Sequence, residues 1–183
     1  VIENVSLSMK PGEILGIVGE SGSGKSTLIR AAMGLLGEGG TVTQGQILYQ
    51  GTNTTIDMTQ IHGEEMRRLR GAEIAMIFQN AGASLCPIRT IEEQLYEAVL
   101  EHESISKGEI RDRAKIGLKD GERVLQSYPF ELSGGMNQRV GIVLAMVLRP
   151  RLLLADEPTS ALDVTVQLQV LREMKKLRDM YGT

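Results

Sequence analysis

The sequence has 183 residues, which fits one domain of ordinary size with a hydrophobic core of its own. Its hydrophobic content of 42% and charged content of 23% exclude a disordered chain, and its formal net charge of −3 provides no basic excess, so we expect no nucleic-acid partner. The single cysteine, Cys86, excludes an intrachain disulfide. The longest apolar run, at 140–148, is far shorter than the roughly 20 residues that a membrane span needs.

In the first half of the chain, the predicted elements alternate between short strands and helices. Alternating apolar side chains predict a half-buried strand at 5–9, and the run ILGIV predicts a buried strand at 14–18. Pro11 and Gly12 form a turn between these two strands. The remaining elements predicted before residue 80 are a helix at 25–35, a strand at 46–49, a helix at 64–70 and a strand at 74–78.

From residue 81 onward most predicted elements are helices, and Gly82 and Pro87 mark irregular chain between them. The predicted elements here are helices at 91–100, 107–116 and 135–148, a buried strand at 152–155 and an amphipathic helix at 165–180. Short apolar strands that alternate with helices predict an α/β fold with a mainly parallel sheet. We therefore expect one domain, 1–183, with an α/β core of 1–86 and 148–183 and a helical subdomain inserted at 87–147.

The strongest motif is GESGSGKS at 19–26, which matches G-x-x-x-x-G-K-[ST] between a predicted strand and a predicted helix. Its glycines let backbone N–H groups curl around phosphate oxygens, and the helix N-terminus adds partial positive charge. Lys25 is expected to neutralise β- and γ-phosphate oxygens, and Ser26 to ligate Mg²⁺. The alternative, a Gly/Ser-rich loop without a ligand, leaves the flanking strand and helix unexplained. The predicted phosphate-binding residues are Gly19, Glu20, Ser21, Gly22, Ser23, Gly24, Lys25, Ser26 and Thr27.

Two carboxylates follow the apolar strand predicted at 152–155. Asp156 is expected to hold Mg²⁺ through water, and Glu157 to face the γ-phosphate and polarise the attacking water. Alone, such a pair is usually a solvated strand end. Next to a phosphate loop, the catalytic interpretation is favoured.

A third motif, Ser133-Gly134-Gly135, precedes the apolar helix. Ser133 is a good N-cap, which on the simplest interpretation is its whole role. A helix that begins with serine and two glycines is also an anion site, for the same reasons as the phosphate loop. Two such sites beside one set of catalytic carboxylates are not explained by a monomer.

Taken together with Gln79 after a strand and Ser160-Ala161-Leu162-Asp163, these motifs resemble the nucleotide-binding domain of ABC transporters over nearly the whole chain. The run ALDVTVQ at 161–167, with Tyr128-Pro129 and Met136, is similar to the importer subgroup for oligopeptides, dipeptides and nickel. The resemblance implies a P-loop NTPase core with a mainly parallel sheet, a small antiparallel β part and an inserted helical subdomain. It also implies hydrolysis of ATP with Mg²⁺.

The resemblance further implies that the chain pairs head to tail with a second ABC ATPase, either identical or related. Ser133, Gly134 and Gly135 would then bind the γ-phosphate of the partner's ATP, and Asp163 would lie at the dimer seam. Gln79 would contact Mg²⁺ or the attacking water and act in catalysis with Lys25 and Glu157; the metal site would combine Gln79 with Ser26 and Asp156. The expected further partners are membrane permease subunits at the cytoplasmic face of the cell membrane and, indirectly, an external solute-binding protein.

The sequence departs from the family pattern in two places. Family members carry a histidine after one further strand and an adenine-stacking aromatic residue near the start, and neither His62 nor His102 occupies the place of that histidine. The resemblance therefore implies a chain shortened at both ends. Two alternatives stay open: a soluble ABC-type ATPase acting on DNA or ribosomes, and a nucleotide-binding module without catalysis.

Overall fold

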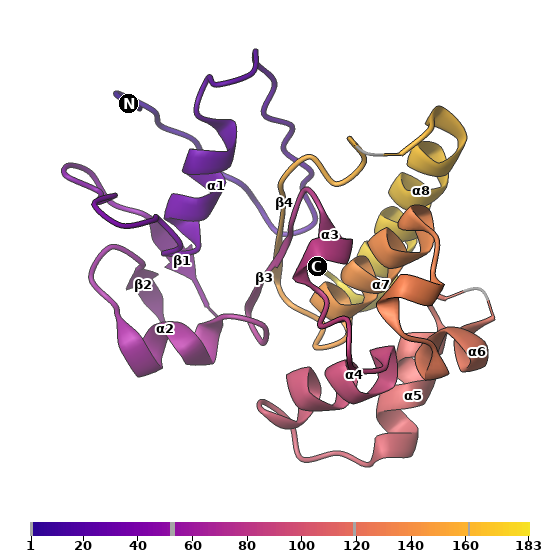
Figure 1. Cartoon of the computed structure of the whole chain (residues 1–183). Coiled ribbons are helices and arrows are strands. Elements are labelled where there is room, and N and C mark those ends of the chain that lie inside the picture. The colour runs from indigo at the N-terminus through magenta and orange to yellow at the C-terminus, as the bar shows by residue number, and fades with distance from the viewer. Residues whose placement is uncertain (1, 52–53, 119, 161) are drawn as a thin grey trace.

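A computed structural model describes residues 2–51, 54–118, 120–160 and 162–183. Two parallel strands, β3 (Ile74–Ile77) and β4 (Leu152–Ala155), pair in the middle of the molecule, with Ile74 opposite Leu152 and Ile77 opposite Ala155. Figure 1 shows α1, α2 and the β1–β2 hairpin on one side of this pair and α4, α5 and α6 on the other. The helices are α1 (Lys25–Ala32), α2 (Gly63–Leu69), α3 (Ala81–Ser84), α4 (Ile91–Leu100), α5 (Lys107–Lys115), α6 (Gly121–Gln126), α7 (Gly134–Met146) and α8 (Val164–Tyr181).

The small antiparallel part consists of β1 (Leu48–Gln50) and β2 (Thr55–Asp57). A backbone hydrogen bond from Gly51 N to Thr54 O, 2.9 Å long, closes the connection between these strands. The hairpin packs Tyr49 into an apolar cluster with Met33, Met58, Met66, Ile74 and Met76. This cluster joins α1, α2 and the hairpin to β3.

Every regular element within 87–118 and 120–147 is helical, as the sequence predicted. The side chains of Val99, Ile110 and Val124 are fully buried in one cluster that joins α4, α5, α6 and α7. A second cluster, built from Ile77, Ile142 and Val170 among others, joins β3 to α7 and α8. Helix α7 therefore contributes to both clusters and connects the helical segment to the parallel strands.

Two strand predictions are wrong. The structure has no strand at 5–9 or at 14–18, and within the second segment the side chains of Ile14 and Val18 are 60% and 96% exposed. The composition of 14–18 suits a buried strand, but a strand also needs a hydrogen-bonding neighbour, and β3 and β4 pair only with each other among the described strands. The parallel sheet is therefore smaller than predicted, and β4 is half-buried where the sequence predicted full burial.

The termini of other elements shift by one to a few residues. The predicted helix at 25–35 ends at Ala32, because Gly34 takes a left-handed φ of 61°. The chain after residue 81, predicted to be irregular, forms the short helix α3. Among the described residues, no helix is both long and apolar enough to cross a membrane.

Candidate nucleotide-binding site

The phosphate loop ends at the N-terminus of α1, and its glycines adopt conformations that other residues avoid. Gly22 and Gly24 have φ values of 79° and 93°, and a Cβ atom at Gly19 would lie 2.8 Å from the Ser23 hydroxyl oxygen. Gly24 is the N-cap of α1, and it provides no side chain to bond the N–H groups of the first turn. Because residues 19–23 are exposed, the loop presents these donors to an anion in solvent.

Lys25 reaches back across the loop that precedes it. Its ammonium nitrogen donates to the carbonyl oxygens of Gly19 and Glu20, at 2.8 and 2.7 Å. The positive charge is thereby held inside the curve of the loop. Lys25 is thus placed where a bound phosphate oxygen would meet both its charge and the N-terminus of α1.

Ser26 and Asp156, distant in sequence, meet at the end of β4. The Ser26 hydroxyl donates to Asp156 Oδ1 at 2.6 Å, and Arg30 lies 3.9 Å from Asp156 Oδ2. Asp156 is only 3% exposed, and its backbone N–H donates to Ile77 O, which continues the pairing of the strands. A buried carboxylate is tolerated here because a hydroxyl and a nearby guanidinium compensate its charge.

These two side chains fit a magnesium site. Mg²⁺ prefers oxygen ligands and is commonly bound by one or two carboxylates together with substrate phosphates and water. Ser26 and Asp156 supply a hydroxyl and a carboxylate whose oxygens already lie within hydrogen-bonding distance of each other. No group of three or more His, Cys, Asp or Glu side chains elsewhere in the described part of the chain could hold a metal.

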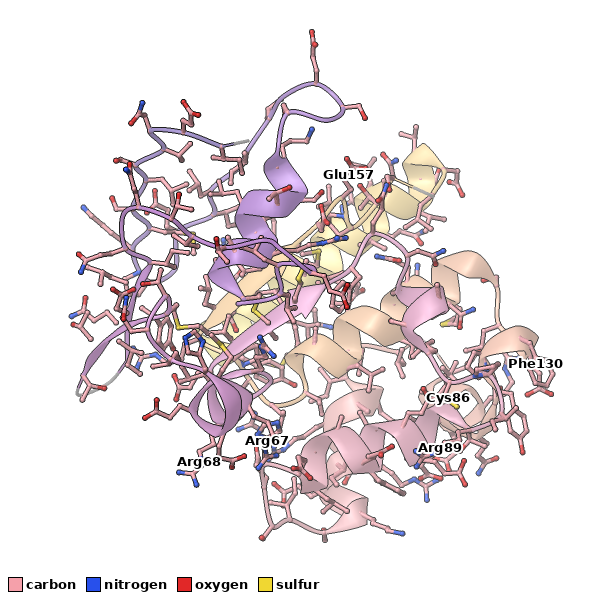
Figure 2. All side chains as sticks on the ribbon, turned by 60° about the vertical axis from the view of Figure 1, so that its left-hand side comes forward. Arg67, Arg68, Cys86, Arg89, Phe130 and Glu157 are labelled. Atoms are coloured by element: carbon pink, nitrogen blue, oxygen red, sulfur yellow. The ribbon has the colours of Figure 1, made fainter. Side chains whose placement is uncertain are left out.

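Gln79 and Glu157 lie next to each other just beyond the ends of β3 and β4. Gln79 Nε2 donates to Glu157 Oε2 at 3.0 Å, and both residues are exposed. Glu157 has a left-handed φ of 45°, and its carbonyl oxygen accepts hydrogen bonds from the backbone N–H and the hydroxyl of Ser160. Figure 2 shows Glu157 well apart from Arg67 and Arg68 and from the group of Cys86, Arg89 and Phe130.

The residues of the serine–glycine motif lie elsewhere. Ser133 caps α7, because its hydroxyl oxygen accepts from Met136 N at 3.3 Å, and both Ser133 and Gly134 are exposed. Asp163 caps α8 by accepting from Val166 N at 3.1 Å. In the part of the chain that the structure describes, no hydrogen bond joins 133–135 to the phosphate loop. Ala161, part of the Ser160–Asp163 motif that carries the resemblance, lies outside the described residues.

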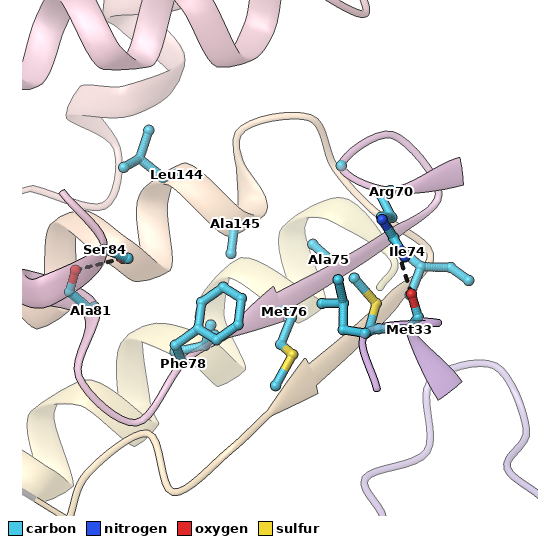
Figure 3. A pocket seen from close by; sticks show the side chains of 14 residues that line it. Met33, Arg70, Ile74, Ala75, Met76, Phe78, Ala81, Ser84, Leu144 and Ala145 are labelled. Carbon is cyan, nitrogen blue, oxygen red and sulfur yellow. Dashed lines mark hydrogen bonds between the residues drawn. The ribbon is translucent and has the colours of Figure 1, made fainter. Parts of the chain in front are cut away.

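A cavity of about 320 Å³ lies along β3, away from these polar groups. Figure 3 shows that it is lined largely by apolar side chains, including those of Met76, Phe78 and Leu144, with Arg70 donating to Met33 O. Neither Lys25 nor Asp156 lines it. Because a triphosphate needs donors and cations, the exposed phosphate loop suits it better than this cavity does.

The sequence analysis missed Gln138 in α7, a polar residue that is only 5% exposed. Its side chain bonds to Ala81, two residues after Gln79, and to Pro158, the residue after Glu157. The available signal was a glutamine two residues before the apolar run at 140–148. In such a position, a polar side chain needs buried partners.

A glycine-rich loop opens α1, and the serine that follows its lysine bonds to an aspartate at the end of a parallel strand. This combination defines a P-loop nucleotide-binding protein. Residues 2–160 match the family described as ABC transporter, and the chain belongs to that family.

Curated relatives cover this chain almost completely. It is 42% identical to the oligopeptide transport ATP-binding protein AmiE of Streptococcus pneumoniae, over 98% of this chain and 51% of AmiE. It is 44% identical to the dipeptide transport ATP-binding protein DppD of Escherichia coli, over 97% of this chain and 54% of DppD. It is 45% identical to the glutathione import ATP-binding protein GsiA of Salmonella typhimurium, over 97% of this chain and 30% of GsiA. The chain thus spans about half the length of AmiE and DppD, and less of GsiA.

A solved structure supports the fold. The ATP-binding cassette MJ0796, in a dimeric post-hydrolysis state bound to ADP and phosphate, superposes with a TM-score of 0.78 at 30% sequence identity. The superposition covers 98% of this chain and 75% of that one. The α/β arrangement described above is therefore that of an ABC cassette.

Proposed function

We propose that this chain is the ATP-binding and ATP-hydrolysing part of a subunit that powers solute import, of the peptide or nickel class, through a membrane ABC transporter. The observation that carries the proposal is the convergence of Lys25, Ser26, Asp156, Gln79 and Glu157 at one edge of the parallel strands. The peptide class is supported by AmiE and DppD, an oligopeptide and a dipeptide transport ATP-binding protein. The import direction is supported by GsiA, a glutathione import ATP-binding protein.

The side chains divide the work of phosphoryl transfer to water. Lys25 and the uncapped N–H groups of α1 bind and neutralise phosphate oxygens. Mg²⁺, when bound at Ser26 and Asp156, supplies further positive charge at the phosphates. Glu157 accepts a hydrogen bond from the attacking water and draws off its proton, while the Gln79 amide orients the Glu157 carboxylate.

The proposed partners follow from the position of the serine–glycine motif. Ser133, Gly134 and Gly135 form the start of α7, where Ser133 and Gly134 are exposed, and no hydrogen bond among the described residues joins them to this chain's own phosphate loop. We infer that they bind the γ-phosphate held by a second ABC ATPase, with Asp163 at the seam between the two. Membrane permease subunits would seat this pair at the cytoplasmic face of the membrane, and an external binding protein would deliver the solute.

The test is ATP turnover by the full-length protein with its partners. Glu157→Gln should lower phosphate release by about a hundredfold or more while Mg-ATP still binds, because it removes the proton acceptor and leaves the phosphate contacts intact. Glu101→Gln is the matched control, since Glu101 is an exposed carboxylate paired with Arg67. Equal turnover of the Glu157→Gln variant and the parent would contradict the role of Glu157, and a parent that binds ATP without hydrolysing it would contradict the enzyme proposal.

A further inference from the structure

Gln138 is a buried polar side chain with a defined orientation. Its Oε1 accepts from Ala81 N at 3.4 Å, and its Nε2 donates to Pro158 O at 2.7 Å. A backbone N–H requires an acceptor and a backbone carbonyl requires a donor, so the two partners fix which end of the carboxamide faces which segment. Neither hydrogen bond is local, because Ala81 begins α3 and Pro158 follows β4.

The two partners lie directly beside the proposed catalytic pair. Ala81 is two residues after Gln79, and Pro158 is the residue after Glu157. The hydrogen bond between Gln79 and Glu157 and the two bonds of Gln138 therefore close a ring that links α7, the chain after β3 and the chain after β4. Within this ring, Gln138 and its partner Ala81 are buried, whereas Gln79 and Glu157 are exposed.

Close packing brings the backbone of α3 to α7 at the same place. A Cβ atom at Gly141, one turn after Gln138, would lie 2.4 Å from the Ala81 Cβ atom. The N–H of Ala81 lies in the first turn of α3, where the helix itself offers no acceptor, so Gln138 supplies one that the helix lacks. Loss of this acceptor would leave the buried N–H of Ala81 unpaired. The segment that carries Gln79 would then no longer be held against α7.

We propose that Gln138 is a positioning residue that holds the segments carrying Gln79 and Glu157 at the spacing that their side-chain contact needs. This inference rests on the proposed ATPase function. Gln138 lies in the helix whose first residues we expect at the partner's nucleotide, so it also ties that helix to this chain's own catalytic pair. A carboxylate displaced by a fraction of an ångström loses its alignment with the attacking water.

The test is Gln138→Leu in the full-length protein, which keeps the side chain near its native size and removes both hydrogen bonds. We expect kcat to fall by about tenfold or more, because the catalytic pair loses its alignment. The KM for Mg-ATP should change by less than about threefold, because Lys25 and Ser26 lie outside the ring.

The matched control is Gln94→Leu. Gln94 is partly buried, and its carboxamide, like that of Gln138, bonds only to backbone groups, here those of Cys86, Arg89 and Thr90, remote from Glu157. It should lower thermal stability to a similar extent and leave kcat near the parental value. Two results would overturn the inference and leave the ATPase proposal standing. One is an equal loss of kcat in Gln138→Leu and Gln94→Leu. The other is a parental kcat in Gln138→Leu while Glu157→Gln is inactive.

Hydrogen exchange provides a readout that needs no turnover. Gln138→Leu should speed exchange at the Ala81 amide by about tenfold, whereas Gln94→Leu should speed it at the Cys86 amide instead. Unchanged exchange at Ala81 in Gln138→Leu would overturn the inference even if the parent protein hydrolyses no ATP. Selective acceleration at Ala81, together with the loss of kcat, would support it.

Discussion

Asp156 is the residue at which folding and the proposed chemistry depend on the same contacts. It is 3% exposed, and its carboxylate is bonded by the Ser26 hydroxyl, with Arg30 at 3.9 Å. A buried carboxylate without such partners would destabilise the fold. The two residues that satisfy it both lie on α1, so the contact fixes α1 to the end of β4 as well as preparing an oxygen pair for Mg²⁺.

Ser26→Ala should therefore impair stability and binding together. Removal of the hydroxyl leaves Asp156 Oδ1 short of its donor, and we expect the free energy of unfolding to drop by about 1–3 kcal/mol. The stabilisation gained on adding Mg²⁺ with ATP should shrink as well, which denaturation with and without the ligand measures. Arg30→Ala is the comparison: its guanidinium is half exposed and 3.9 Å away, so its loss should cost less than about 1 kcal/mol. A larger effect from Arg30→Ala than from Ser26→Ala would contradict this view of Asp156.

At the scale of elements, the sequence predicted best what is determined locally. The predicted and observed bounds of α4 are the same, because Thr90 and Glu93 form a capping box at its start. The hydrogen bonds from the backbone and hydroxyl of Thr90 hold the pKa of Glu93 below its ordinary value, which reflects the same local contact. The phosphate loop is likewise a contiguous motif, and it opens α1 at Lys25 as predicted.

Elements that depend on distant partners were predicted less well. The segment 14–18 has the residues of a buried strand and remains unpaired, because pairing is decided by other segments of the chain. Strand β2 was missed because it has only three residues and forms through its pairing with β1. The contacts of Gln138 could not be predicted either, since they join three segments that only the tertiary structure brings together.

The same glycine-to-alanine change should have opposite effects on stability in α7, which packs closely against α3, and in α5. Gly141→Ala places a methyl group 2.4 Å from the Ala81 Cβ atom, so α3 must move, and we expect a net destabilisation of about 1–3 kcal/mol. Gly108→Ala in α5 meets nothing closer than the Ser106 hydroxyl oxygen at 3.9 Å and should stabilise by roughly 0.5–1 kcal/mol. Chemical denaturation of both variants measures the two changes. A Gly141→Ala protein as stable as the parent would show that α3 is not packed against α7 in this way.

At the scale of the whole molecule, two helix N-termini suited to anions lie in separate parts of the chain. That of α1 lies beside Lys25 and Asp156, whereas that of α7 is exposed and has no hydrogen bond to the phosphate loop among the described residues. One chain therefore presents one set of the proposed catalytic carboxylates and, apart from it, a second helix start suited to an anion. The proposed head-to-tail pair would use both, because each α7 would close the site of the other chain.

Mixing two inactive variants tests this arrangement. Lys25→Ala removes the phosphate-binding ammonium, and Gly134→Asp places a negative charge at the start of α7, where a Cβ atom meets nothing within 4 Å and folding should be undisturbed. In a head-to-tail pair of one variant with the other, one site carries both defects and the second site carries neither. An equal mixture of the two full-length variants should thus recover about a quarter of the parental ATP turnover, since about half of the pairs are mixed and each has one intact site. If 133–135 instead act on their own chain's nucleotide, both chains of every pair are defective, and the mixture shows no more phosphate release than the two variants measured separately.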